Sequence, residues 1–361
     1  MPYLFFPLMA AQPRLLSALG LDRAGAFDAH LPGYEEVQAG DRGLLAVAAA
    51  PEPARAKGKV IEIAARDWPR IVYFLEAAGC DFEAVEIEGR PTNLPLAKIP
   101  LPIDPDVWQA RALGYWSEAV GEITECFGHQ PAQWVARRLP VILARAASKS
   151  RAKSENRPAR TQFRASDIEM DYFQRPYSEF FSVAEYRYRH PTYRGELSQP
   201  LDRAVFLSAD AVTVLPYDPV RDCVLLVEQV RTGPLGRGDP VPWIIEPIAG
   251  RIEPGDTPEE TAHKEAFEEA GLSLKSLHRI GGYYSSTGCL AEYLVSFVGI
   301  ADLPDSILGV HGVPEEGEDI ASYILPRAEF MARLEAGEMP DGPLILSAYW
   351  LELNRSKFQV G

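Results

Sequence analysis

The sequence predicts a two-domain protein of mixed structure, an α+β domain followed by an α/β sandwich around a mixed sheet. Its 361 residues exceed the length of one ordinary domain. Strand-like apolar runs and helix-like stretches occur in both halves. The stretch 146–165, AASKSRAKSENRPARTQFRA, is rich in Ser, Ala and basic residues and has no apolar periodicity. We therefore expect domains at 1–145 and 166–361 joined by a linker at 146–165, although a basic run of this kind can also bind an anionic partner.

The first 145 residues are expected to form a small α+β domain of their own. Helices are predicted at 69–78, from Val107 onwards, and over a stretch at 131–147 that leads into the linker. Strands are predicted at 3–6, 43–47, 58–63 and 82–87.

The C-terminal half alternates strands with two or three helices, which implies an α/β sandwich. One helix should begin near Thr257, a second should cover 326–337 and a third should follow from Leu344. Strands are predicted at 204–215, 223–229, 243–248, 282–286 and 293–300.

Composition excludes several classes of protein. The net charge of −15 argues against a nucleic-acid partner, so an anionic substrate would have to be attracted by local cations and metal. No run of about 18 apolar residues suggests a membrane span, and the apolar N-terminus lacks the basic residues of a signal peptide. The four cysteines are far apart and have no zinc-site spacing, which predicts reduced thiols and a cytoplasmic protein.

The most informative segment is 250–272, which reads GRIEPGDTPEETAHKEAFEEAGL. Pro254 and Gly255 predict a turn, and Thr257 and Glu260 have the spacing of a capping box. A loop should therefore lead directly into a helix at this point.

Three carboxylates of this helix share one face, because Glu265, Glu268 and Glu269 stand at i, i+3 and i+4. Like charges placed in this way repel one another unless a cation lies among them, and clustered oxygen ligands suit Mg²⁺ or Mn²⁺. A Glu-rich helical face is more commonly solvated surface. Here, however, the glycines, the proline turn and Lys264 also fall at the positions that a known metal-binding motif requires, and this favours the metal site.

The segment fits G-x5-E-x7-R-E-U-x-E-E-x-G-U, the motif of the Nudix hydrolases, with Asp256 and Lys264 in place of a glutamate and an arginine. Beyond the motif, residues 170–358 resemble the ADP-ribose pyrophosphatases of that superfamily. The likeness is carried by three further segments, 216–233, 242–250 and 310–320. The resemblance implies a Nudix α/β/α sandwich with a mixed sheet, a hydrolase and a homodimer.

By this resemblance, the backbone carbonyl of Ala249 and the carboxylates of Glu265 and Glu269 would bind the metal. Glu268 would be a further ligand or would support the ligands, and Glu318 would position or deprotonate the attacking water. The chemistry needs these groups, because bound metal neutralises the diphosphate oxygens and a base must reach the water. Without the resemblance, Glu318 would be assigned to a solvated acidic loop.

The resemblance also implies substrate-binding residues at Arg231, Arg203 and Glu246. An arginine can bind a phosphate with two parallel hydrogen bonds, although an arginine at a strand end is often only surface. Glu246 has a structural hydrogen-bond role as its alternative. Phe181 and Tyr186 lie where an aromatic ring could stack on adenine, but core packing is the simpler role for both.

The N-terminal domain resembles the γ-glutamylcyclotransferase-like fold. Its first loop, residues 5–9, reads FFPLM and lacks the glycine that would let backbone amides approach a substrate. Glu76 could occupy that family's acid–base position, but an exposed helix glutamate is the plainer interpretation. We therefore expect a domain without catalytic activity. The combination of domains resembles the ADP-ribose pyrophosphatases associated with bacterial tellurite resistance.

The sequence as a whole predicts an enzyme that uses Mg²⁺ to hydrolyse ADP-ribose to AMP and ribose 5-phosphate. The loop 283–288 reads YYSSTG and lacks the proline usual in that subfamily, so another nucleoside diphosphate sugar, such as an ADP-hexose or GDP-mannose, remains open. A non-catalytic ligand sensor and a lyase activity of the N-terminal domain are two further alternatives. The intact set of Glu265, Glu268 and Glu269 argues against the sensor.

Overall fold

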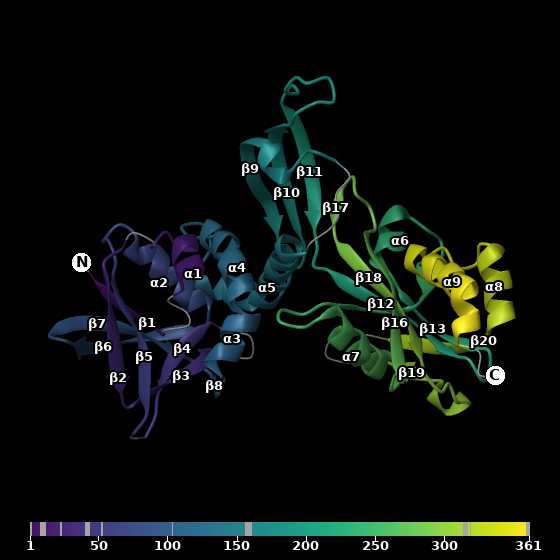
Figure 1. Cartoon of the computed structure of the whole chain (residues 1–361), viewed down its shortest axis with the longest axis horizontal. Coiled ribbons are helices and arrows are strands. Elements are labelled where there is room, and N and C mark those ends of the chain that lie inside the picture. The colour runs from purple at the N-terminus through teal and green to yellow at the C-terminus, as the bar shows by residue number, and fades with distance from the viewer. Residues whose placement is uncertain are drawn as a thin grey trace. The chain divides into compact units, whose positions relative to one another are not determined.

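The structure is a computed structural model that describes residues 2–7, 12–21, 24–39, 44–51, 53–102, 104–155, 161–312, 317 and 319–358. The chain divides into two compact units, Met1–Leu207 and Ser208–Gly361 (Figure 1). None of the described helices is both long enough and apolar enough to cross a membrane.

The first unit begins with a mixed sheet and its covering helices. The strand order is β2-β5-β1-β7-β4-β3-β8, and β6 pairs with β7. The strands are β1 (Tyr3–Pro7), β2 (Ala26–Pro32), β3 (Tyr34–Ala39), β4 (Leu45–Ala49), β5 (Arg55–Glu62), β6 (Cys80–Ile87), β7 (Arg90–Ala97) and β8 (Pro100–Pro102). The helices are α1 (Pro13–Ala18), α2 (Trp68–Ala77), α3 (Pro105–Arg111), α4 (Leu113–Glu125) and α5 (Ala132–Ser154).

Two apolar cores lie on opposite faces of this sheet, because successive strand residues point to opposite sides. Leu4 and Phe6 of β1 belong to the core that the helices cover, together with Phe74 of α2 and Trp116 of α4. Phe5 belongs instead to a smaller core made by strand residues. The predicted α+β character of the N-terminal half is confirmed, and each predicted strand and helix there overlaps an observed one.

Part of the predicted linker is helical. The helix α5 continues to Ser154, so the first nine residues of the stretch 146–165 are helix rather than tether. Ala146 and Ala147 are buried against the helical core, and Lys153 forms an ion pair with Glu118 of α4 at 2.7 Å. Small apolar residues and paired charges therefore keep the helix ordered where composition alone suggests a flexible segment.

The first unit ends in an antiparallel meander with the strand order β11-β10-β9. The short 3-10 helix η1 (Ala165–Asp167) precedes β9 (Glu169–Ser178), β10 (Ser182–Arg189) and β11 (Leu201–Leu207). Tyr186 of β10 is the register partner of both Phe173 of β9 and Arg203 of β11. The boundary between the compact units therefore follows β11, whereas the sequence places it at 146–165.

The second unit is built on a mixed sheet with the order β16-β18-β12-β13-β20-β19, with β14 beside β13 and β15 beside β12. The strands of this sheet are β12 (Ala211–Asp218), β13 (Cys223–Val230), β14 (Trp243–Glu246), β15 (Ile248–Arg251), β16 (Ser276–Tyr284), β18 (Tyr293–Ile300), β19 (Val310–His311) and β20 (Ile320–Pro326), and the unit also contains the short strand β17 (Leu290–Ala291) outside it. Its helices are α6 (Thr232–Arg237), α7 (Pro258–Ala270), α8 (Arg327–Glu335) and α9 (Gly342–Asn354), with the 3-10 turns η2 (Asp305–Ile307) and η4 (Arg355–Lys357).

Helices cover both faces of this sheet, which confirms the predicted three-layer sandwich. Val212 and Val214 of β12 pack in one core with the alanines of α7. Leu215 and Tyr217 of the same strand pack in the other core with residues of α8 and α9. Figure 1 shows α7 on one side of the sheet and α8 and α9 on the other.

Two predicted strands of this region are each divided in two. The stretch 204–215 contains the end of β11 and most of β12, and the chain leaves the strand conformation at residues 208–210. The stretch 243–248 is broken at Pro247, between β14 and β15, because proline has no N–H for the strand ladder. Strand β18 has the predicted bounds, and β13 is only one residue longer than predicted.

Candidate active site

The helix α7 begins where the sequence places it. The Thr257 hydroxyl accepts a hydrogen bond from the Glu260 amide at 3.1 Å, and the Glu260 carboxylate accepts one from the Thr257 amide at 2.9 Å. Gly271 ends the helix in the left-handed region, with φ of 61°. The predicted capping box is therefore confirmed, and it fixes the rotation of the three glutamates that follow.

Glu269 lies at the inner edge of α7. Ala262, Ala266 and Ala270 bury one face of the helix against the sheet, and Glu269 is carried inward with them to 3% exposure. Its carboxylate accepts a hydrogen bond from the Ala249 amide of β15 at 3.3 Å. A buried carboxylate that is supported by a backbone amide is costly to ionise unless a cation approaches it.

Glu265 lies directly against the backbone of β15. A Cβ atom at position 250 would be 1.9 Å from the Glu265 carboxyl carbon, so any larger residue there would displace this carboxylate. The glycine that begins the motif therefore lets a carboxylate reach the strand that carries Ala249.

The electrostatics of Glu269 follow from this packing. Burial and, to a lesser extent, the neighbouring Glu265 raise the pKa of Glu269 to about 8, and the Ala249 amide only partly opposes this rise. In the absence of a cation this carboxyl is therefore largely protonated at neutral pH. A bound divalent ion would reverse that preference.

Glu268 and Lys264 lie at the outer side of the same helix. Glu268 is half-buried, and Lys264 donates a hydrogen bond to Glu253 at 3.2 Å. Partial burial lowers the pKa of Lys264, but the bond to Glu253 and the nearby Glu268 and Glu265 outweigh it, so the pKa is raised. The lysine therefore keeps its charge beside the carboxylates.

Arg231 and Glu246 meet next to this helix. Arg231, between β13 and α6, donates from Nε to the Glu246 carboxylate at 2.8 Å, and Glu246 is 7% exposed. Burial raises the pKa of Glu246 to about 7, although Arg231 opposes the rise. The electrostatic influence of both residues also reaches Glu269, so the structure brings three predicted site residues together.

Two carboxylates that the sequence analysis did not single out belong to the same surroundings. Burial raises the pKa of Glu292 and of Asp341, and Arg231 opposes the rise at both. Asp341 caps α9 through the Leu344 amide at 2.8 Å, and Glu292 accepts a hydrogen bond from Ser285 at 3.2 Å. An Asp before Gly-Pro at a predicted helix start was a signal for the first. No local pattern indicated the second.

The remaining predicted residues are outside the described part of the second unit. Arg203, Phe181 and Tyr186 belong to the meander of the first unit, where Phe181 packs on Phe206 at a ring distance of 4.7 Å. Glu318 lies outside the described residues. Its flanking strands β19 and β20 pair with each other, and β19 contacts α7.

The carboxylates do not form a complete cage by themselves. Among the described residues, no three His, Cys, Asp or Glu side chains converge closely enough to hold a metal ion. Mg²⁺ is commonly held by one or two carboxylates, with waters and substrate phosphate as the remaining ligands. Glu265, the buried Glu269 and the adjacent Ala249 backbone fit this open arrangement.

Comparisons with known proteins show the family to which the chain belongs. The family model described as NUDIX domain matches residues 207–345. The chain is 34% identical over 202 residues to the ADP-ribose pyrophosphatase of Escherichia coli (strain K12), a match that covers 56% of this chain and 95% of that protein. The chain belongs to the Nudix family.

Other Nudix relatives differ in the substrate that they are named for. The ADP-ribose pyrophosphatase of Haemophilus influenzae is 33% identical over 199 residues, 55% of this chain and 91% of that protein. The GDP-mannose pyrophosphatase of Citrobacter koseri is 31% identical over 149 residues, 41% of this chain and 76% of that protein. The matches cover nearly the whole length of the two ADP-ribose pyrophosphatases but only about half of this chain. This Nudix protein therefore carries an additional domain relative to them.

Proposed function

We propose that this Nudix protein hydrolyses the diphosphate of ADP-ribose to give AMP and ribose 5-phosphate, with Mg²⁺ or Mn²⁺ as its cofactor. One observation carries the proposal. Glu269 is a buried carboxylate with a raised pKa, and it lies beside Glu265 against the backbone of Ala249 and Gly250. Two carboxylates in this position are stable in their charged forms only with a cation, and diphosphate hydrolysis needs one.

The residues divide the work of holding and orienting. The Ala249 carbonyl and the carboxylates of Glu265 and Glu269 would hold the cation, with Glu268 as a further ligand or a support. A bound divalent cation neutralises diphosphate oxygens and makes a bound water acidic. Glu318 would accept a proton from the attacking water. The half-exposed Arg231 would bind a phosphate oxygen with the guanidinium nitrogens that Glu246 leaves available.

Substrate recognition would involve Arg231, Glu246 and Arg203. Glu246 orients Arg231 through the 2.8 Å hydrogen bond, so the guanidinium is fixed before a phosphate arrives. The relatives named ADP-ribose pyrophosphatase support ADP-ribose as the substrate.

A second nucleoside diphosphate sugar is the main alternative. A GDP-mannose pyrophosphatase is also related, at 31% identity, and the loop 283–288 lacks the proline usual in the ADP-ribose subfamily. Glu292 follows this loop, and its carboxylate accepts the hydrogen bond of Ser285. We therefore propose that the sequence of this loop determines which sugar the enzyme accepts. A ligand sensor without catalysis is disfavoured by the intact carboxylate set.

The test is a panel of ADP-ribose, ADP-glucose and GDP-mannose, each incubated with Mg²⁺ in ¹⁸O-water, with products identified by mass spectrometry. We expect ADP-ribose to be the best substrate, and the label to appear in only one of its two phosphate products. The Glu269→Gln variant is the matched negative control. Preferential cleavage of GDP-mannose would identify GDP-mannose rather than ADP-ribose as the substrate. If none of the compounds were cleaved, the result would favour a non-catalytic ligand sensor.

For the whole molecule we propose a cytoplasmic homodimer whose N-terminal domain has a γ-glutamylcyclotransferase-like fold without catalysis. Glu76 lies on α2 and is half-buried. Residues 5–7 of the predicted first loop belong to β1, and residues 8–9 are outside the described residues. Because residues 5–9 lack the glycine that would let backbone amides approach a substrate, assays for cyclotransferase activity should give no product.

A further inference from the structure

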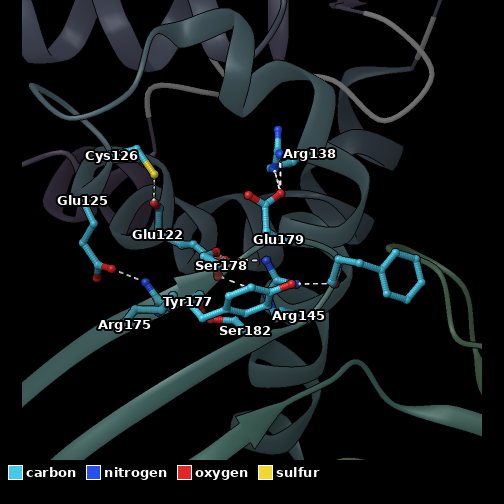
Figure 2. Close-up of polar contacts among 11 residues, drawn as sticks. Glu122, Glu125, Cys126, Arg138, Arg145, Arg175, Tyr177, Ser178, Glu179 and Ser182 are labelled. Carbon is cyan, nitrogen blue, oxygen red and sulfur yellow. Dashed lines mark hydrogen bonds and ion pairs between the residues drawn. The ribbon is translucent and has the colours of Figure 1, made fainter. Parts of the chain in front are cut away.

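A cluster of charged side chains joins the helices of the N-terminal domain to the turn of the β9–β10 hairpin (Figure 2). The helices are α4 and α5, and the hairpin turn comprises residues 178–182. All of these elements belong to the first compact unit. The end of α5 and the start of β9 are separated in the sequence by residues 155–168, which include the rest of the predicted linker.

The centre of this cluster is a buried ion pair. Glu122 of α4 and Arg145 of α5 have side chains that are 7% and 4% exposed, and the Arg145 Nη2 and Glu122 Oε1 atoms are 2.5 Å apart. Both residues also bond to the hairpin. Arg145 Nη1 donates to the Phe180 carbonyl at 3.0 Å, and the Ser178 hydroxyl donates to Glu122 at 3.1 Å.

Two further ion pairs flank the centre, each with one partner on the helices and one on the hairpin. Arg138 of α5 donates from Nε to the Glu179 carboxylate at 2.5 Å and stacks on Trp134 at 3.7 Å. Arg175 of β9, whose side chain is 5% exposed, pairs with Glu125 of α4. The hairpin turn is therefore held on both sides as well as at its centre.

This arrangement of charges favours recognition of one particular segment more than it adds to overall stability. A buried ion pair adds little net stability compared with apolar packing, because two charges must leave water. Here each member of the central pair makes an additional hydrogen bond to the hairpin. The hydrogen-bonding groups of the buried pair are therefore fully satisfied only when the hairpin is in place. A surface built in this way selects one partner and one register.

We propose that the N-terminal domain is a built-in docking partner for the β9–β10 hairpin, with Glu122 and Arg145 as the residues that recognise it. The partner is thus a segment of the same chain. The ADP-ribose pyrophosphatases related to this protein leave little length for such a domain. The proposal gives the additional domain a role that does not depend on the hydrolytic activity.

The test uses the full chain with a specific protease site inserted within residues 156–160. The folded protein is cut there, and the association of the two halves is measured by native mass spectrometry and by dilution on a sizing column. We expect the halves to remain together after cleavage. Separation of the unsubstituted halves at micromolar concentration would overturn the proposal.

The key variant is Glu122→Leu/Arg145→Met, which removes both charges and so leaves no unpaired buried ion. Loss of the bonds to Ser178 and Phe180 should weaken the association by on the order of 100-fold. The single variant Arg145→Met should weaken it at least as much. Association of the double variant as tight as that of the unsubstituted protein would also overturn the proposal.

Two controls separate docking from unfolding. Arg187→Ala removes an exposed ion pair between β10 of this hairpin and Asp202 of β11, and it should leave the association unchanged. The near-ultraviolet circular dichroism of the buried Trp108 and Trp116 reports whether the N-terminal core is intact. We expect this signal to be retained in the double variant.

Discussion

At the scale of single residues, Glu269 has to satisfy two opposing requirements. Cation binding needs the ionised carboxylate, whereas its burial raises the pKa to about 8. Glu269→Gln keeps the shape and removes the charge. We expect kcat to fall by about 100-fold or more, equivalent to about 3 kcal/mol, while the fold without cation is as stable as before. Glu259→Gln, on the exposed first turn of α7, is the control, and a near-normal kcat for Glu269→Gln would remove the helix from the mechanism.

Glu246 should make the stability depend on pH. Its pKa is about 7 in the folded protein and lies near 4.5 in an ordinary glutamate. A group whose folded pKa is raised contributes stability that is complete below about 4.5 and is lost as the pH rises through 7. Glu246→Gln removes this loss. Between pH 5 and pH 8 the free energy of unfolding of the variant should therefore increase relative to that of the unsubstituted protein.

The size of that gain is at most about 3 kcal/mol, reduced by the loss of the charged bond to Arg231. Thermal unfolding without metal, measured at several pH values, checks the prediction. A melting-temperature difference that is constant with pH would show that Glu246 does not titrate in this range.

Arg231 and Glu318 should affect different kinetic constants. Arg231→Ala should raise KM by about 10-fold with a smaller effect on kcat, because a phosphate contact stabilises both the bound substrate and the transition state. Glu318→Gln should instead lower kcat, because proton acceptance matters only as the bond breaks. Steady-state kinetics of the two variants check the assignment, and the reverse pattern would exchange the two roles.

At the scale of the elements, Asp218 holds the connection between β12 and β13. Its carboxylate accepts hydrogen bonds from the backbone amides of Val220, Arg221 and Leu303 at 2.9, 3.0 and 3.1 Å. Burial disfavours the charged form of Asp218, but these amides and the charge of Arg221 outweigh it, so the pKa is lowered. Stability from this group is therefore present above the ordinary pKa and is lost as the pH falls through the lower folded pKa.

Asp218→Asn should destabilise the second unit by about 1–3 kcal/mol at neutral pH, because the amide group presents a donor where one backbone amide needs an acceptor. The difference should shrink as the pH falls below 4. Denaturant unfolding at pH 7 and pH 3.5 measures it. Asp302→Asn, which alters an exposed ion pair with Lys275, is the control.

The sequence predicts those elements whose signals are local. The α7 capping box and the face shared by Glu265 and Glu269 depend on residues a few positions apart, and both were predictable. The stretch 204–215 was misjudged because β11 and β12 are both apolar and only Ser208–Asp210 separates them. Asp341 was missed as a neighbour of Arg231, because the two are brought together only by the folded sheet.

At the scale of the whole molecule, the boundary between the two compact units also depends on contacts between distant residues, which the sequence does not reveal. Composition marks 146–165 as a linker, but the compact unit extends to Leu207. The contacts of Arg145 with Phe180 and of Glu122 with Ser178 join segments that are 35 and 56 residues apart, and local patterns do not reveal such pairs. The α/β sandwich of the second unit was predictable, because its strands and helices alternate along the chain.

The docking proposal leads to a kinetic prediction for the uncut chain. The predicted groups for the chemistry lie in the second unit, whereas Arg203 lies on β11, which pairs with β10. In Glu122→Leu/Arg145→Met we therefore expect kcat to stay within about threefold and KM to rise. The rise should be absent when Arg203→Ala is already present, which a double-mutant cycle measures. A large fall in kcat would instead give the N-terminal domain a part in the chemistry.

The docked hairpin also has a consequence for the order of events during synthesis. Strand β9 exposes most of its side chains, including Tyr172 and Tyr177, and an isolated hairpin of this kind is only marginally stable in water. A ribosome makes α4 and α5 before β9 and β10, and domains generally fold as they emerge. The surface formed by Glu122 and Arg145 is therefore complete when the aromatic hairpin leaves the exit tunnel, and the edge strand β9 meets its own partner before it can pair with other chains.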